Sequence, residues 1–142
     1  MIYMGKINSL ALIFSLWIYS GCSPGTNDHA LNSSIEKLRK EFRLGAFDKL
    51  LVLDLEKCQS CNMGIAKPVL DFHNQNPNAI VVIYSGSEKK ARIFYDNNPA
   101  NFIWDGTGLS KKLNLNPDMI NLYERHHDKN FNWVDFKILY PN

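Results

Sequence analysis

Cysteine is scarce in this sequence, and that scarcity limits the metal chemistry that the chain can support. Among 142 residues there are three cysteines: Cys22, and the residues Cys58 and Cys61 of a Cys-x-x-Cys motif. A structural zinc site usually takes four sulfur or imidazole ligands at fixed spacing. The sequence has no second cysteine pair, so the motif is at most half of such a site, and we assign no metal to it.

An excess of charge of one sign is also missing. The 16 Lys and Arg residues nearly balance the 14 Asp and Glu residues, giving a formal net charge of +2. Proteins that bind nucleic acid usually carry clustered positive charge, and no basic stripe is present here. The sequence therefore predicts no nucleic-acid partner. Hydrophobic residues make up 45% of the chain, which is enough for one packed domain.

No hydrophobic run in the chain is long enough to cross a bilayer. The longest N-terminal run, residues 10–19, follows Lys6, whereas a membrane-spanning helix needs about 20 apolar residues. A short apolar run behind a positive residue is typical of an export signal. The small residues Ser20 and Gly21 then precede Cys22. This pattern resembles the bacterial lipoprotein signal, in which the cysteine is lipidated and becomes the new N-terminus.

The lipoprotein resemblance divides the chain into three parts. It implies a signal peptide over residues 1–21 and a lipid anchor in a membrane through Cys22. Residues 22–32 are small, polar and contain Pro and Gly, so we predict a flexible tether there and a domain over residues 33–142. A plain secretory signal and an uncleaved anchor are the alternatives. Lipidation is favoured because it explains a cysteine that would otherwise be left over in an exported protein.

The Cys-x-x-Cys motif stands between a strand pattern and a helix pattern. Residues 50–55 form a short, strongly apolar run that predicts a mostly buried strand. Over Asn62–Gln75 apolar residues recur on one helical face, and Pro68 is expected to kink or interrupt that helix. Cys58 is thus expected at the N-terminus of the helix and Cys61 in its first turn.

This position favours redox chemistry. Free N–H groups and the helix dipole stabilise an anion at a helix N-terminus, so a thiol there ionises more readily to the nucleophilic thiolate. A second thiol three residues later is close enough to attack a mixed disulfide and release a reduced partner. A purely structural disulfide and half of a zinc site are the alternatives.

The remaining patterns predict an α/β domain. Ser33 and Glu36 form a capping box that begins a first helix, and residues 79–84 are apolar on both faces, as in a central parallel strand. The hairpin strands, residues 118–125 and 132–140, alternate apolar and polar residues, which predicts one buried and one wet face. Between the strand over residues 79–84 and the hairpin we expect a helix over residues 88–96, a strand over 102–104 and a short helix over 109–113.

This order of elements resembles the thioredoxin family, and in particular the TlpA-like, membrane-anchored thiol–disulfide oxidoreductases of the bacterial envelope. The resemblance rests on the Cys58–Cys61 motif after an apolar strand, on residues 102–109, and on Leu115-Asn116-Pro117 before the hairpin. It implies a thioredoxin-like fold, with a mixed central sheet flanked by helices. The family's C-terminal helix is expected to be lacking.

The resemblance also implies residue roles and partners. Cys58 would attack a partner disulfide and Cys61 would resolve the intermediate, forming a Cys58–Cys61 disulfide with no cofactor. Asn116 and Pro117 would dock the substrate chain, with a cis peptide bond before Pro117, although an ordinary loop proline is the alternative. The partners would be protein thiols or disulfides and an upstream reductant. The lipid-anchored domain would face the periplasm.

Some charged residues near the motif are weaker candidates. A carboxylate near the resolving cysteine can accept its proton, and Asp54 suits that role better than Glu56, which we interpret as a solvated residue at the strand end. Lys57 either favours a Cys58 thiolate electrostatically or is a plain surface lysine.

The alternative function is a non-catalytic thioredoxin-like lipoprotein that binds Cu, Zn or a protein partner. A metal would need a third ligand, most plausibly a histidine. His126 and His127 are adjacent in the predicted hairpin turn, and adjacent strand residues point to opposite faces, which hinders joint ligation of one ion. His73 lies on the apolar face of its helix, where a semi-buried structural histidine is the simpler interpretation.

Overall fold

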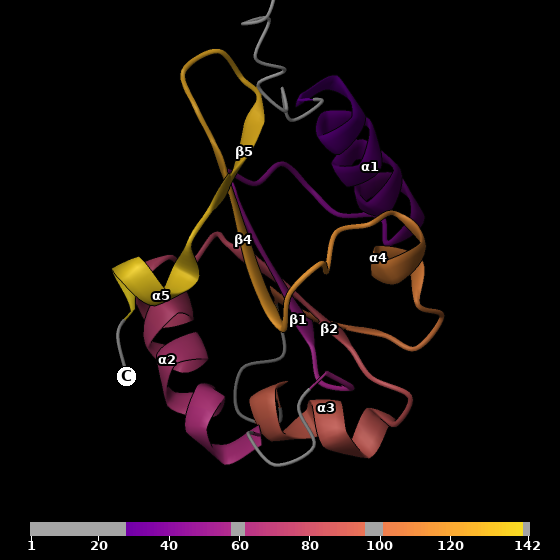
Figure 1. Ribbon diagram of the computed structural model, residues 1–142, viewed down its shortest axis with the longest axis vertical. Helices are drawn as coiled ribbons and strands as arrows, with labels where there is room; N and C mark the ends of the chain where they lie inside the picture. Colours follow the sequence, from indigo (N-terminus) through magenta and orange to yellow (C-terminus); the bar gives the residue numbers. More distant parts are fainter. Residues whose placement is uncertain (1–27, 58–61, 96–100, 141–142) are drawn as a thin grey trace, which may run out of the picture.

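Five strands form one mixed sheet in the computed structural model, which describes residues 28–57, 62–95 and 101–140 (Figure 1). The strands lie in the order β3-β2-β1-β4-β5. Strand β1 pairs in parallel with β2, and β2 with β3, whereas β1–β4 and β4–β5 are antiparallel. Their bounds are β1 Lys49–Asp54, β2 Ile80–Tyr84, β3 Phe102–Asp105, β4 Ile120–Arg125 and β5 Phe131–Val134.

Helices cover both faces of this sheet. Helix α1 (Asp28–Glu41) packs on one face, and helices α2 (Asn62–Gln75), α3 (Glu88–Tyr95) and the single turn α5 (Phe136–Leu139) pack on the other. The short helix α4 (Leu109–Lys112) leads into residues that pack on the α1 side. Among the described residues, no helix combines the length and the apolar character needed to cross a membrane.

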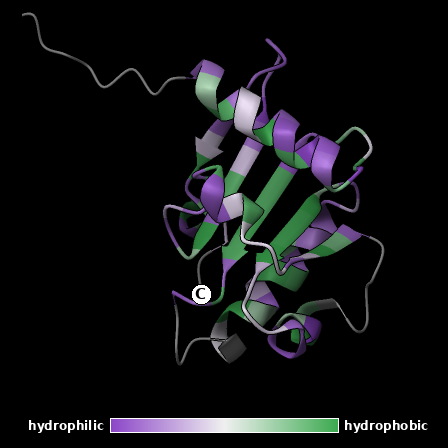
Figure 2. Cartoon of the chain, turned by 90° about the vertical axis from the view of Figure 1, so that its right-hand side faces the viewer, coloured by the Kyte–Doolittle hydropathy of each residue, from purple (hydrophilic) through white to green (hydrophobic). Residues whose placement is uncertain are grey.

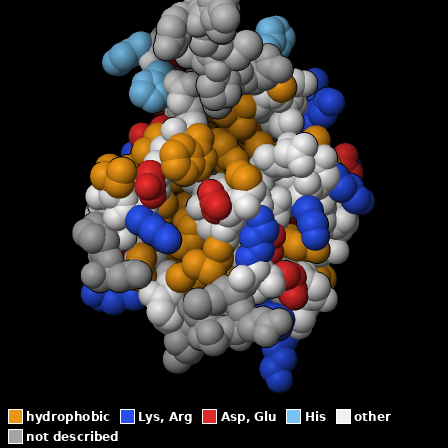
Figure 3. All heavy atoms as spheres, in the orientation of Figure 1, with side chains coloured by type: hydrophobic (Ala, Val, Ile, Leu, Met, Phe, Trp, Pro, Cys, Tyr) orange, Lys and Arg blue, Asp and Glu red, His pale blue; other side chains and the backbone are white. Residues whose placement is uncertain are grey.

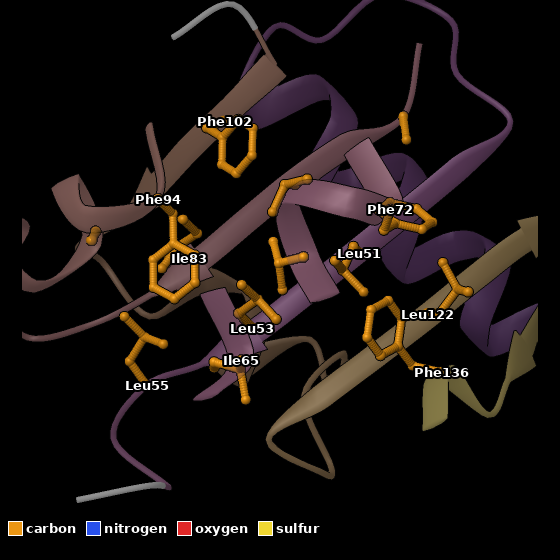
Figure 4. Packing of buried hydrophobic residues seen from close by; sticks show 14 residues of the cluster. Leu51, Leu53, Leu55, Ile65, Phe72, Ile83, Phe94, Phe102, Leu122 and Phe136 are labelled. Carbon is orange, nitrogen blue, oxygen red and sulfur yellow. The ribbon is translucent and has the colours of Figure 1, made fainter. Parts of the chain in front are cut away.

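The strands are hydrophobic on both faces because both faces are covered (Figure 2). In β1, Leu51 and Leu53 pack toward α2 and α3 beside Phe72 (Figure 4), while Leu50 and Val52 pack toward α1. All four side chains are fully buried. This alternation within one apolar run is the expected result for a central strand, and the strand predictions for β1 and β2, including their parallel pairing, are confirmed.

Helix α1 begins at Asp28 rather than at the predicted capping residue Ser33. The predicted start was wrong because the apolar stripe of Ile35 and Leu38 continues back to Leu31, which packs against the same cluster. The N–H of Phe131 in β5 also donates to the Asn32 side chain over 2.9 Å. Residues 28–32, expected in the tether, are therefore part of the folded unit.

Helix α2 runs without a break through Pro68, contrary to the expected interruption. A proline inside a helix clashes with the carbonyl four residues earlier and leaves it without a donor. Here that residue is Gly64, which is exposed and has no atom within 4 Å of a Cβ position. Because Gly64 is exposed, water can solvate the freed carbonyl. The buried face of α2 consists of Ile65, Val69 and Phe72.

The predicted hairpin forms, but the predicted wet face of its first strand is buried, whereas Trp133 on the second strand is half exposed as expected. Leu122 faces the α2 side as expected, whereas Asn121 and Tyr123, expected in water, are 0% and 2% exposed. They face α1, whose cover over this end of the sheet the strand pattern alone did not indicate. The Tyr123 hydroxyl donates to the carbonyl of Leu115 over 3.0 Å, and burial raises the pKa of Tyr123 to about 12.

The second hairpin strand ends at Val134, and the expectation that no helix follows it was wrong. Asp135 accepts a hydrogen bond from the Lys137 N–H over 3.0 Å and caps α5. Phe136 then turns into the core, while Ile138, predicted to be buried in a strand, is 76% exposed. This single helical turn replaces the end of the strand predicted over residues 132–140, in a chain that was expected to lack the family's C-terminal helix.

Candidate functional site

The cysteines lie outside the described residues, so the site is described through the residues that flank the motif. Cys22 precedes the first described residue, and Cys58 and Cys61 fall between residues 57 and 62. Lys57, just before the motif, follows the end of β1, and Asn62, just after it, begins α2. The predicted strand before the motif and helix after it are therefore confirmed.

Asp54 ends β1 as a buried carboxylate, only 2% exposed. Its Oδ2 accepts a hydrogen bond from Asn116 Nδ2 over 2.8 Å, and its Oδ1 accepts one from the Glu56 N–H over 3.0 Å. Its own N–H donates to the carbonyl of Met119 over 2.8 Å. Buried polar groups need such partners to offset desolvation. The strand end is thereby joined to the loop before β4.

Lys57 joins the same loop from the other side. Its Nζ donates to the carbonyl of Asn116 over 2.6 Å and to the carbonyl of Pro117. We call these two hydrogen bonds the Lys57 clasp. The structure thus brings Asn116 and Pro117 against the residue that precedes Cys58. No described residue has a cis peptide bond, so the cis bond expected before Pro117 is corrected to trans.

Glu56 is exposed just after β1, as the sequence suggested, but it also has partners in the turn after β2. Its Oε1 accepts hydrogen bonds from the Gly86 N–H over 3.0 Å and from Ser85 Oγ over 3.2 Å. The Lys90 ammonium lies 3.5 Å away. The Gly86 hydrogen bond and the Lys90 charge hold the pKa of Glu56 below its ordinary value. Glu56 therefore ties the end of β1 to the turn after β2, although the exposed ion pair itself adds little stability.

The end of β3 is tied to the same edge of the sheet. Trp104 Nε1 donates to the carbonyl of Ser85 over 2.9 Å. A Cβ on Gly106 would fall 2.5 Å from Trp104 Cζ2, so this turn needs glycine for the ring to lie against it. The carboxyl ends of β1, β2 and β3 thus meet in one linked cluster, where α/β sheets usually place their sites.

Asp105 anchors the turn that follows β3. The side chain is fully buried and accepts hydrogen bonds from Thr107 Oγ1, from the Leu109 N–H, and from both the N–H and Oγ of Ser110, at 2.7–3.0 Å. Burial by itself raises the pKa of Asp105, but the hydrogen bonds led by those of Ser110 outweigh it, and the pKa is lowered. Asp105 is therefore a structural anion that starts α4.

The histidines considered as metal ligands lie away from the motif. His126 and His127 are exposed in the β4–β5 turn, beyond Glu124, which pairs with Lys49 at the start of β1. The motif follows the other end of β1, and six strand residues span roughly 17 Å. Among the described residues, no group of three or more His, Cys, Asp or Glu side chains is arranged to hold a metal ion.

His73 packs in the last turn of α2 against Phe102, with ring centroids 4.9 Å apart. Its Nε2 is buried without a hydrogen-bond partner in the described part of the chain, and burial lowers the pKa of His73 below 6.5. As the pH falls below about 6.5, the unfolded chain takes up this proton before the folded chain does. The stability that neutral His73 provides is therefore full above that pH and is lost progressively below it.

We expect His73→Phe to reduce this loss, because a phenyl ring keeps the contact with Phe102 and does not titrate. Urea unfolding at about pH 7 and about pH 5.5 measures the change. The free energy of unfolding should fall more between these pH values in the unmodified chain than in His73→Phe. Equal decreases in the two proteins would contradict the assignment.

A groove opens beside the loop that the Lys57 clasp holds. Its volume is about 410 Å³, and it lies between the start of β4 and α5, lined by Asp118, Met119, Ile120, Trp133, Asp135, Phe136 and Lys137. Trp133 is half exposed. Figure 3 shows apolar side chains gathered on the face that carries β4, β5 and α5, with charged groups among them. The groove starts at the residue after Pro117.

Comparison of the chain with models of known protein families, with curated protein sequences and with solved structures finds no match. The structure is an α/β unit with a five-stranded mixed sheet flanked by helices, a layout compatible with a thioredoxin-like fold. The family resemblance and the activity that it implies stay predictions.

Proposed function

We propose that this chain is a thioredoxin-like thiol–disulfide oxidoreductase of the bacterial envelope, in which Cys58 and Cys61 reduce or exchange disulfides of partner proteins. The observation that carries the proposal is the frame around the motif. A strand precedes it and a helix of 14 residues follows it, and the residue before Cys58 is fastened to Asn116 and Pro117. Elements far apart in the sequence thus converge on the motif.

The helix provides the chemical reason for reactivity. Helix α2 begins at Asn62, the residue after Cys61, and a helix N-terminus presents free N–H groups and the positive end of its dipole, which favour a nearby thiolate. The Lys57 ammonium adds a positive charge one residue before Cys58. Cys58 is thus the attacking thiol, and Cys61 is the resolving thiol.

The exchange proceeds in two balanced steps. The Cys58 thiolate attacks one sulfur of a partner disulfide, the partner S–S bond breaks, and the displaced partner thiolate takes up a proton. The Cys61 thiolate then attacks the Cys58 sulfur, which forms the Cys58–Cys61 disulfide and releases the second partner thiol. Two electrons pass to the partner. An upstream dithiol reductant returns them to the cysteine pair, so no cofactor is needed.

Asp54 is the residue suited to accept the Cys61 proton. It is buried at the end of the strand that leads to the motif, and each carboxylate oxygen can accept a further hydrogen bond beyond the one it has. Asn116 fixes its orientation from the loop between α4 and β4, residues 114–119, which we call the docking loop. The proposed proton acceptor is therefore hydrogen-bonded to the loop on which the partner chain would lie.

The location follows from the sequence. Lipidation of Cys22 would hold the domain at a membrane of the envelope, facing the periplasm, where protein disulfides persist and need reduction or exchange. A reductase anchored to this membrane would meet partner proteins that lie at the same membrane surface. The groove beside Pro117 gives such a partner room to lie against the site.

The experiment is reduction of a peptide closed by one disulfide, with dithiothreitol as the electron donor. The proposal expects the chain to accelerate the reaction well above dithiothreitol alone, with turnover at substoichiometric amounts. A rate equal to that of dithiothreitol alone would overturn it, and the partner-binding or metal-binding alternative would become the working hypothesis.

A further inference from the structure

The Lys57 ammonium is held by backbone carbonyls and not by a carboxylate. None of the ion pairs among the described residues includes Lys57. Both hydrogen bonds of the clasp go to neutral carbonyls, those of Asn116 and Pro117. Its charge is thus not neutralised by a neighbouring anion in the described part of the chain, and it stands one residue before Cys58.

Two other carbonyls of the docking loop, those of Asp118 and Met119, already accept hydrogen bonds from groups of the folded domain. Asn121, fully buried, accepts from the Asp118 N–H over 3.0 Å and donates to the Asp118 carbonyl over 2.6 Å. The Met119 carbonyl accepts from the N–H of Asp54, and Pro117 has no N–H. An extended partner chain that pairs with this loop therefore needs a carbonyl that Lys57 now occupies.

Of the residues that bind the docking-loop backbone, Lys57 is the one whose side chain can move at low cost in free energy. Its side chain is exposed and has four rotatable bonds, whereas Asp54 and Asn121 are buried and fixed by several hydrogen bonds each. A partner N–H can replace the ammonium at a carbonyl while water solvates the released charge. The same exchange at Asp54 or Asn121 would leave a buried polar group unpaired.

We propose that Lys57 is a positioning residue that holds the docking carbonyls of Asn116 and Pro117 until the main chain of an extended peptide segment displaces it. The inference rests on the proposed function, because the displacing segment is the chain that flanks the partner disulfide. Once displaced, the ammonium is free to lie near the Cys58 thiolate. Docking of a peptide and activation of the thiol are thereby linked through one side chain.

The two roles of Lys57 separate in the kinetics of Lys57→Met. Without the ammonium the carbonyls are free, so KM for a disulfide-closed peptide is expected to fall about fivefold. The loss of positive charge raises the thiol pKa, so the pH profile of the rate moves to higher pH. With 2-hydroxyethyl disulfide, which has no main-chain N–H and does not displace Lys57 from the clasp, KM is expected to stay unchanged and the pH profile to shift less than with the peptide.

The test compares the full chain with Lys57→Met, Lys57→Arg and Lys112→Met on both substrates. Lys57→Arg keeps charge and donors and should restore values near those of the unmodified chain. Lys112→Met removes a positive charge from the exposed end of α4 and should change neither KM. A peptide KM that is unchanged or raised in Lys57→Met overturns the displacement. Absence of turnover by the unmodified chain on both substrates overturns the proposed function as well.

Discussion

Cys61→Ser is expected to hold the chain in a covalent complex with its disulfide partner, and Cys58→Ser is expected to lose exchange completely. The attacking thiol forms the mixed disulfide, and only the second thiol can break it from within. Removing Cys61 therefore stops the reaction after the first step. Removing Cys58 takes away the thiol next to the Lys57 ammonium, the positive charge that favours its thiolate, and so removes the attacking group.

The measurement is non-reducing electrophoresis with mass spectrometry after mixing each variant with a disulfide-closed peptide. Cys61→Ser should carry the peptide on Cys58, in a bond that dithiothreitol releases. Cys22→Ser is the matched control, because it removes the cysteine outside the motif and should leave exchange intact. Trapping through Cys22, or equal trapping by Cys58→Ser and Cys61→Ser, would contradict the assigned order of attack and resolution.

Asp105→Ala is expected to lower the free energy of unfolding by about 3 kcal/mol or more. The carboxylate is fully buried and accepts four hydrogen bonds, two of them from Ser110. Alanine would leave these donors without an acceptor and would remove the anion from the start of α4. Since hydrogen bonding lowers the pKa of Asp105, its contribution is present at neutral pH and is lost only as the pH falls below about 3.8 through the folded-state pKa.

Urea unfolding at neutral pH measures this loss. Asp135→Ala is the matched control: it removes an N-cap from the exposed helix α5 and is expected to cost about 1 kcal/mol. The comparison separates a capping effect from the burial of a multiply bonded carboxylate. Equal losses in the two variants would show that Asp105 contributes no more than an ordinary cap.

The central strands were predictable from the sequence because the apolar character of their side chains indicates that both faces are buried. The apolar runs Leu50–Leu53 in β1 and Ile80–Tyr84 in β2 predict strands covered on both faces, and those strands lie side by side in the sheet. The short helix α4 and the hairpin were likewise indicated by turn residues. Local patterns of this kind depend on neighbours within a few positions, so they can be recognised without knowledge of the fold.

Predictions failed where a distant element decides the outcome. Tyr123 and Asn121 looked like the wet face of a hairpin strand, yet α1 buries them from the start of the described chain. Ile138 continued an alternating pattern, yet capping by Asp135 turned that segment into a helix. In each case the tertiary context overrode the local pattern.

The site shows the same division. Placing the motif between a strand and a helix needed only local sequence. The Lys57 clasp, however, joins Lys57 to residues that lie 59 and 60 positions later in the chain. A lysine at a strand end looks like a surface residue, and nothing in its neighbours marks the carbonyls that it binds. The partners of Glu56 were missed for the same reason, because Ser85 and Gly86 belong to the turn after β2.

A redox titration of the cysteine pair tests the central claim most directly. The chain is equilibrated with mixtures of reduced and oxidised dithiothreitol or glutathione, and the thiols of Cys58 and Cys61 are counted by alkylation and mass spectrometry. We predict a reversible two-electron transition, at a potential between about −270 and −120 mV, the range of thiol–disulfide exchange proteins. A pair that stays reduced, or stays oxidised, across the whole range without exchanging would contradict the account.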